Sequence, residues 1–219
     1  KILNAAGEKW TFRLDGYEAT NFGMLSGNPD WQKEATMKLI NAAIKIGAKL
    51  IVLPECGHAY MALRWMGANM YGKPLPFKVL HISEYLADAL NSGKIKVKKV
   101  DKSVTYHDPC QIARNAGVMD EPRYILGQLT DDFREMTPDP KYNWCCGGGG
   151  GLVALGEETL DFRMKSSRIK ADQVKDTGAT ILATACENCH TQLSNLNDHY
   201  KMNVQVEFLS SMVADALVR

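Results

Sequence analysis

The chain carries one sequence pattern in each of its halves, and this repeat constrains the fold more than any other feature. Residues 79–90 read VLHISEYLADAL and residues 206–217 read VEFLSSMVADAL, with the same apolar register and the same final four residues. Upstream, residues 43–60 and 173–192 both run from a helix end through Gly-Ala into a short apolar run and a turn that contains cysteine. A period of about 130 residues indicates duplicated domains and excludes a solenoid of short repeats.

Short runs rich in β-branched residues alternate with longer segments of helical period. The expected strands are residues 49–54, 103–108, 180–185 and 204–208. The expected helices lie around residues 30–46, 81–92, 157–177 and 189–200. This alternation predicts an α/β fold of two tandem, pseudo-repeated lobes with mostly parallel sheets. We place the lobes at residues 1–95 and 96–219, and expect ligands at the carboxyl ends of the strands.

The first lobe is expected to be a degenerate copy. Asn21 and Phe22 stand where the second half has Cys145 and Cys146, and only Cys56 remains of a C-x-x-C pair. Too few residues precede Asn21 for an opening strand and turn. We therefore interpret the first lobe as N-terminally truncated and the chain as the C-terminal part of a longer polypeptide.

Composition excludes several classes of protein. Of 219 residues, 45% are hydrophobic, enough for one large or two small cores, and the formal net charge is +1. No long run of lysine or arginine supports binding of nucleic acid. No stretch approaches the 18 or so apolar residues of a membrane-spanning helix.

Five of the six cysteines follow residue 109 and fall in three separate turns: Cys110, the pair Cys145 and Cys146, and Cys186 with Cys189. Thiolates at C-x-x-C spacing plus remote cysteines are typical of iron–sulfur sites. Zinc needs four ligands and leaves a fifth thiol without a purpose, and structural disulfides need an oxidising compartment. The pattern favours iron–sulfur chemistry, with zinc and disulfides as the alternatives.

A glycine run follows the cysteine pair. Residues 147–151 are all glycine, and we expect Gly147, Gly148 and Gly149 to bring bare backbone amides close to a bulky anion. A flexible linker is the alternative. No Gly-Lys-Ser/Thr follows, so a nucleotide-phosphate loop is a poor interpretation.

These cysteine motifs resemble the cysteine-rich CCG domain of heterodisulfide reductases and their relatives. The resemblance covers the whole chain and is strongest to the K subunit of the Dsr membrane complex and the D subunit of membrane-bound heterodisulfide reductase. It implies a 4Fe–4S cluster, non-cubane in this family, in the second lobe. The ligands implied are Cys110, Cys145, Cys146, Cys186 and Cys189.

Four further residues are candidates for the site. His107 lies in the turn that presents Cys110, and Arg114 follows Cys110 by four residues, so both are expected beside the cofactor. In the degenerate lobe, Cys56 is either a buried apolar thiol or a redox thiol, and His58 in the same turn could donate a proton. We expect these two to face the cluster across a cleft between the lobes.

The resemblance implies an oxidoreductase that reduces a disulfide or trisulfide on a small sulfur-carrier protein of the DsrC type. Its implied partners are a ferredoxin-like module of the same polypeptide and a membrane subunit that oxidises quinol through haem b. The implied location is cytoplasmic, attached to the inner membrane through those partners. The alternatives are an electron-relay subunit of a glycolate, lactate or glycerol-phosphate system, and a zinc-structured interaction module.

Overall fold

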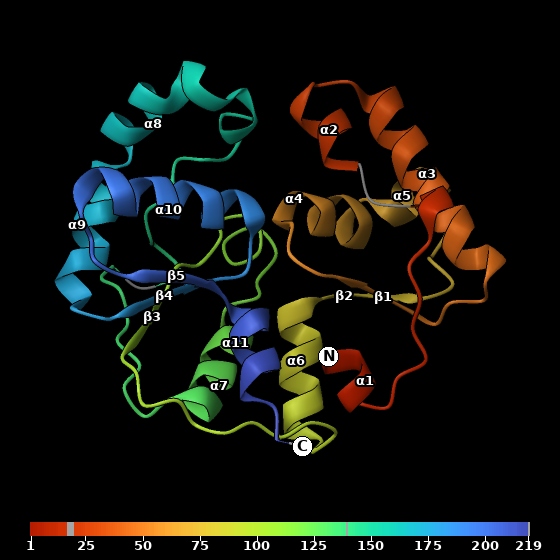
Figure 1. The fold of residues 1–219 in the computed structure, drawn as a ribbon. Helices are drawn as coiled ribbons and strands as arrows, with labels where there is room; N and C mark the ends of the chain where they lie inside the picture. Colours follow the sequence, from red (N-terminus) through yellow and green to blue (C-terminus); the bar gives the residue numbers. More distant parts are fainter. Residues whose placement is uncertain (17–19, 139, 219) are drawn as a thin grey trace.

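The computed structural model describes residues 1–16, 20–138 and 140–218, which form two small parallel sheets flanked by helices (Figure 1). In the first sheet β1 (Leu50–Leu53) pairs with β2 (Lys78–His81), with Leu50 opposite Lys78. In the second sheet the order is β3 (Val104–Tyr106), β4 (Ile181–Thr184) and β5 (Gln205–Phe208). All these pairings are parallel, which confirms the α/β fold with parallel sheets.

Helices make up most of the remaining structure. In the first half they are α1 (Ile2–Ala5), a 3-10 turn (Leu14–Gly16), α2 (Thr20–Leu25), α3 (Pro29–Lys45), α4 (Gly57–Tyr60), a π-helical turn (Met61–Trp65), α5 (Gly67–Tyr71) and α6 (Ile82–Asn91). In the second half they are α7 (Asp120–Leu129), a 3-10 segment (Val153–Thr159), α8 (Leu160–Ser166), α9 (Arg168–Thr177), α10 (Glu187–Tyr200) and α11 (Leu209–Ala216).

The sequence repeat is also a repeat of structure. In each half a helix ends at a left-handed glycine, a strand follows, and a cysteine precedes the next helix: α3, Gly47, β1 and Cys56 in the first half, α9, Gly178, β4 and Cys186 in the second. A second strand and helix then complete each half, β2 with α6 and β5 with α11. Among the described residues the first half has no counterpart of β3.

Local sequence explains where the main helices begin. The side chain of Asn28 accepts hydrogen bonds from the backbone amides of Asp30 and Trp31, and Pro29 occupies the first turn of α3, where no amide donor is needed. At α6 the His81 side chain accepts from the Ser83 amide, while Glu84 accepts from the His81 amide. These caps fix the helix starts at Pro29 and Ile82, each one residue from the start expected from the sequence.

The prediction of one continuous helix over residues 157–177 is wrong. It is broken into the 3-10 segment, α8 and α9, and Ser167 separates the last two with φ −104° and ψ 10°. This serine is buried, and its hydroxyl accepts a hydrogen bond from Gln192 on α10. The break turns the chain, so α8 and α9 reach different parts of the second half.

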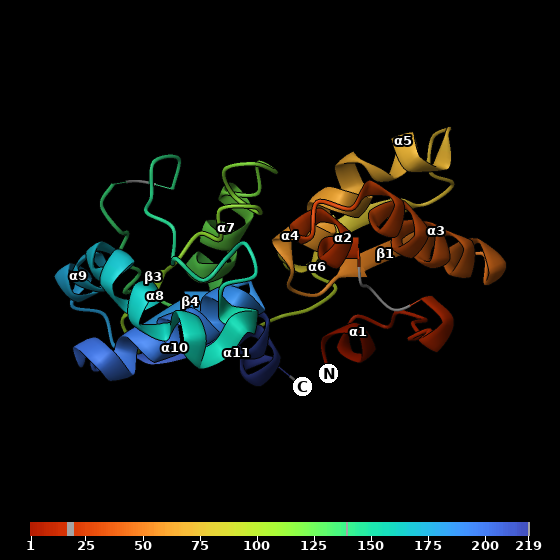
Figure 2. The same cartoon turned by 90° about the horizontal axis from the view of Figure 1, so that it is seen from above.

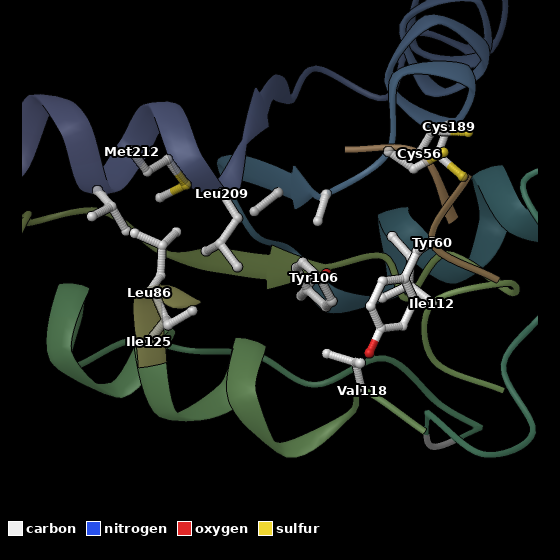
Figure 3. Packing of buried hydrophobic residues seen from close by; sticks show 14 of the residues in the cluster. Cys56, Tyr60, Leu86, Tyr106, Ile112, Val118, Ile125, Cys189, Leu209 and Met212 are labelled. Carbon is white, nitrogen blue, oxygen red and sulfur yellow. The ribbon is translucent and has the colours of Figure 1, made fainter. Parts of the chain in front are cut away.

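One hydrophobic core runs through both halves. The last helix of the first half, α6, packs against α7 and α11 of the second (Figure 1). Leu86 on α6 and Ile125 on α7 are fully buried and lie beside each other in Figure 3. On the other side of the view, Tyr60 points toward Ile112, so the core continues up to the turn that carries the cysteines.

This packing brings the two cysteine turns face to face. In Figures 1 and 2, α4 and α10 approach each other in the middle of the molecule, with the second half on one side and the first on the other. The Glu187 amide, at the start of α10, donates to the Glu55 carboxylate, which lies just before α4. None of the helices in the described ranges combines the length and apolar composition needed to cross a bilayer.

Candidate metal centre

Five cysteine sulfurs converge at the carboxyl edge of the second sheet. Cys110 lies in the turn after β3, and Cys186 precedes α10, whose first turn carries Cys189. Cys145 and Cys146 come from the loop between α7 and the 3-10 segment. The Sγ atoms of Cys146 and Cys189 are 3.3 Å apart, so this loop closes directly over the helix start.

The site is open on one side. Cys146, Cys186 and Cys189 are 2%, 6% and 5% exposed, whereas Cys110 is half-buried and Cys145 is exposed. A pocket lies over the sulfurs, and residues of both halves line it: Gly57, His58, Pro109, Cys110, Gln111, Cys145, Cys146, Gly149, Cys186, Asn188 and Cys189. The expected cleft between the halves is therefore present at the cysteines.

Backbone amides of the glycine run point at the sulfurs. The Gly147 amide donates to the Cys145 Sγ at 3.3 Å, and the Gly148 amide donates to the Cys146 Sγ at 3.5 Å. Gly147 has φ +83°, and a Cβ there would lie 1.8 Å from the Ser167 hydroxyl. A Cβ on Gly148 would lie 2.7 Å from the Gln192 Cβ. Both positions require glycine.

Gly149 differs from its two neighbours. It lines the pocket, but a Cβ at this position would meet no atom within 4 Å and its φ is not positive. The expectation that Gly149 needs bare backbone therefore has no steric basis, because a Cβ there would enter open space.

The thiols share protons through contacts between sulfurs. Hydrogen bonds with Cys110 and Cys146 lower the pKa of the Cys145 thiol, and the same bonds raise the pKa of Cys110 and of Cys146. Hydrogen bonds with Cys146 and Cys186 raise the pKa of Cys189. Because each ionised sulfur opposes ionisation of the next, full deprotonation of the set requires a compensating cation.

His107 lies within this sulfur set. Its ring is 1% exposed, neither ring nitrogen has a hydrogen-bond partner, and one ligand atom of His107 lies within 4.8 Å of Cys146 and Cys189. Burial and the nearby Lys170 charge lower its pKa well below the usual range. The adjacent Asp108 is instead paired with Arg123 at 2.8 Å. An imidazole buried without partners is suited to contact a group bound at the cysteines.

Arg114 is exposed and lies outside the pocket lining. Its guanidinium donates to the Asn143 carbonyl at 2.5 Å, and the Asn143 side chain donates to the Asp108 carbonyl at 3.1 Å. The residue thus holds the backbone that leads into the cysteine pair. A direct role beside the cofactor stays a prediction.

The first half supplies atoms to the site. Gly57 donates its backbone amide to the Cys186 sulfur, and a Cβ on Gly57 would lie 2.7 Å from the Gln111 side chain. His58 lines the pocket, where burial lowers its pKa and the Cys145 charge opposes that shift. Cys56 is buried at the start of α4 and is not among the residues that line the described pocket. Its redox role stays a prediction.

Three buried polar residues near the site were missed by the sequence reasoning. Arg163 on α8 donates to the side chain of Gln192 and to the Gly156 carbonyl, which ties the segment after the glycine run to α10. Lys170 on α9 is fully buried. The third residue is Gln192 on α10. These polar side chains fall on the inward faces of expected amphipathic helices, and because such side chains are seldom buried without a partner, their positions could have indicated a polar site.

These residues fit an iron–sulfur cluster. The donor set is rich in sulfur, amides of a glycine cradle point at two of the sulfurs, and an imidazole without a partner lies among them. His107, Cys146 and Cys189 alone would also suit zinc, but five cysteines exceed the four ligands of a structural zinc site.

Comparison with known families agrees with this donor set. Residues 104–194 match the family model for the CCG cysteine-rich domain, a range that begins at β3 and ends within α10. The chain belongs to the CCG family of heterodisulfide reductases and their relatives. The matched CCG range contains all five cysteines and the whole glycine run.

Curated relatives extend the likeness beyond the CCG domain. The chain is 37% identical to the D subunit of dihydromethanophenazine:CoB–CoM heterodisulfide reductase from Methanosarcina barkeri, over 86% of this chain and 46% of that protein. It is 34% identical to Hdr-like menaquinol oxidoreductase iron–sulfur subunit 2 of Archaeoglobus fulgidus, over 75% of this chain and 31% of that protein. The D-subunit likeness is confirmed; the K-subunit likeness stays a prediction.

A third relative is EtfAB:quinone oxidoreductase of Syntrophomonas wolfei, 28% identical over 89% of this chain and 28% of that protein. The chain thus spans less than half the length of these three relatives. All three are named as oxidoreductases or their subunits, and two are iron–sulfur or heterodisulfide reductase subunits by name. The chain therefore resembles parts of proteins that are named as oxidoreductases or their subunits.

The glycine cradle gives a matched pair of variants. Gly148→Ala should lower the iron content of the purified protein at least several-fold, because the new Cβ would push the cysteine loop away from Gln192. Gly149→Ala should retain the parent iron content, since its Cβ enters open space. Iron per chain after anaerobic reconstitution is the measurement. Equal loading of both variants would show that the loop is only a spacer.

The cysteines give a second pair. Cys146→Ser should abolish or disturb the cluster, because this buried sulfur lies 3.3 Å from Cys189 inside the site. Cys56→Ser should load as much iron as the parent, since Cys56 does not line the pocket and the first half has no other cysteine. Iron content and the visible absorption spectrum measure both. Loss of iron from the Cys56 variant would contradict our account of the degenerate half.

Proposed function

We propose that this chain is the catalytic iron–sulfur part of a heterodisulfide-reductase-like enzyme. Its substrate would be a disulfide or trisulfide on a small sulfur-carrier protein of the DsrC type, in dissimilatory sulfur metabolism. The observation that supports this most strongly is the pocket over the cysteines, because a centre that only relays electrons needs no open space for a substrate. The names of the Hdr-like relatives support the reaction class.

Cys110, Cys145, Cys146, Cys186 and Cys189 would hold the cofactor, a non-cubane 4Fe–4S cluster. When bound, it supplies one-electron redox chemistry at the base of the pocket. The amides of Gly147 and Gly148 then offset negative charge on the sulfurs, and the hydrophobic core beneath excludes water from that side.

Reduction of the substrate follows a simple balance. The S–S bond of a disulfide breaks as two electrons and two protons are taken up, and two thiols form. A trisulfide that takes up two electrons and two protons gives one thiol and one persulfide. The electrons come from a reduced quinol or haem partner, and the protons come from groups at the pocket. His58 is the candidate donor, because it lines the pocket together with the second-half cysteines and carries a titratable imidazole.

The partners follow from the same proposal. Electrons would reach the site through a ferredoxin-like module of the same polypeptide and a membrane subunit that carries haem b. Attachment on the cytoplasmic side of the inner membrane would then be indirect. The membership of the relatives in Hdr-like and quinone-linked enzymes supports protein partners in general.

An electron relay is the second candidate. The likeness to an EtfAB:quinone oxidoreductase favours the relay, because the name of that relative describes electron transfer to a quinone and mentions no disulfide. In such a relay the pocket would remain without a substrate, and the glycolate, lactate or glycerol-phosphate systems belong to this class.

Electron paramagnetic resonance separates the two candidates. The loaded protein is oxidised, given one equivalent of electrons, and mixed with a carrier peptide that bears a disulfide or trisulfide. The reductase predicts a changed cluster signal with this peptide and an unchanged signal with its S-methylated form or a 2-hydroxy acid. An unchanged signal with every sulfur compound, in protein that contains intact cluster, would favour the relay.

A further inference from the structure

Lys170 is a buried cation whose direct contacts are all neutral. Its side chain is 0% exposed, and the ammonium donates to the Gln173 amide oxygen and, at 3.7 Å, to the Met136 sulfur. Among the described residues no carboxylate lies within salt-bridge distance of it; the nearby Asp108 is paired with Arg123. A buried charge without a counter-charge is costly, so its retention requires an explanation.

Apart from Asp108, the negative groups that act on Lys170 are cysteines of the metal centre. Burial lowers the pKa of Lys170 to about 8, and the charges of Cys146, Asp108, Cys189 and Cys145 act in the opposite direction. The lysine charge in turn acts on His107, which lies against Cys146 and Cys189. The backbone amide of Lys170 donates to the Ser167 carbonyl, and the Ser167 hydroxyl is the atom that a Cβ on Gly147 would meet, so the start of α9 lies against the glycine that follows Cys146. Lys170 is not among the residues that line the pocket.

The internal repeat provides a comparison within the same chain. Gly178 and Gly47 end the equivalent helices α9 and α3, and each donates its amide to the carbonyl three residues earlier. Eight residues before these glycines stand Lys170 in the second half and Leu39 in the first. Both side chains are buried. The half with five cysteines has the cation, and the degenerate half has an aliphatic residue.

We infer that Lys170 is a fixed counter-charge for the cysteine centre, which stabilises the negatively charged loaded site and raises the reduction potential of the group bound there. The inference rests on the proposed iron–sulfur function. The lysine charge would act through space, without contact between Lys170 and the substrate. Lys170 is therefore not a catalytic residue but one that acts through the cysteine centre. A positive charge favours addition of an electron to a nearby anionic centre.

The test compares three proteins: the parent, Lys170→Met, which removes the charge at similar side-chain length, and Leu39→Met, its matched control on α3. Without iron, Lys170→Met should melt at or above the parent temperature, because an uncompensated buried charge has been removed. Loaded with cluster, it should lose iron to a chelator at least several-fold faster than the parent. Leu39→Met should behave like the parent in iron loss.

The second readout is a redox titration followed by absorption. At a fixed electrode potential the reduced-to-oxidised ratio of Lys170→Met should fall roughly tenfold, about 59 mV for a one-electron couple. Lys170→Arg, which keeps the charge, should restore much of the parent ratio. The Leu39→Met ratio should equal that of the parent.

Two results would overturn the inference. One is a Lys170→Met protein that is destabilised equally with and without cluster, or fails to fold without it, since this is the behaviour of a packing residue. The other is an unchanged redox ratio in a loaded variant. If the parent itself binds no iron and sulfide, the proposed function fails, and that result is distinct from failure of the lysine inference.

Discussion

The structure depends on one electrostatic constraint, the convergence of five cysteine sulfurs in a largely buried place. Thiolates so close together repel one another, and the opposing pKa directions of Cys145 and its neighbours show that their protons are shared. The surrounding features offset negative charge: two glycine amides, the positive end of α10, and the Lys170 ammonium. The cysteine thiolates together with a bound cation would form an anionic group, and the surrounding amides and the Lys170 ammonium would stabilise that group.

The first half repeats part of the scaffold of the second half but has one cysteine where the second half has five. Its helix, strand and cysteine turn repeat those of the second half, yet Leu39 stands at the position of Lys170 and Cys56 does not line the pocket. The first half helps to enclose the pocket over the cysteines, because Gly57 donates to the Cys186 sulfur and His58 lines the pocket. A lobe without a cluster thus forms one wall of the partner lobe's pocket.

Local signals in the sequence predicted the repeat, the cysteine turns and the described strands other than β2, since β-branched runs, capping residues and C-x-x-C spacing act within a few residues. The break at Ser167 was invisible because helical period continues through it, and α7 was hidden by Pro122 and Gly127 in its own sequence. The Glu55 contact with α10 and the placement of Lys170 depend on tertiary packing between distant segments. No local pattern encodes such contacts.

The central claim is that this centre holds iron and sulfide, and elemental analysis of the anaerobically purified parent protein tests it most directly. Iron, acid-labile sulfide and zinc are measured per chain in the same sample. The account predicts about four iron and about four sulfide per chain, the composition of a 4Fe–4S cluster, with little zinc. About one zinc per chain without sulfide would contradict it and indicate a structural metal site instead.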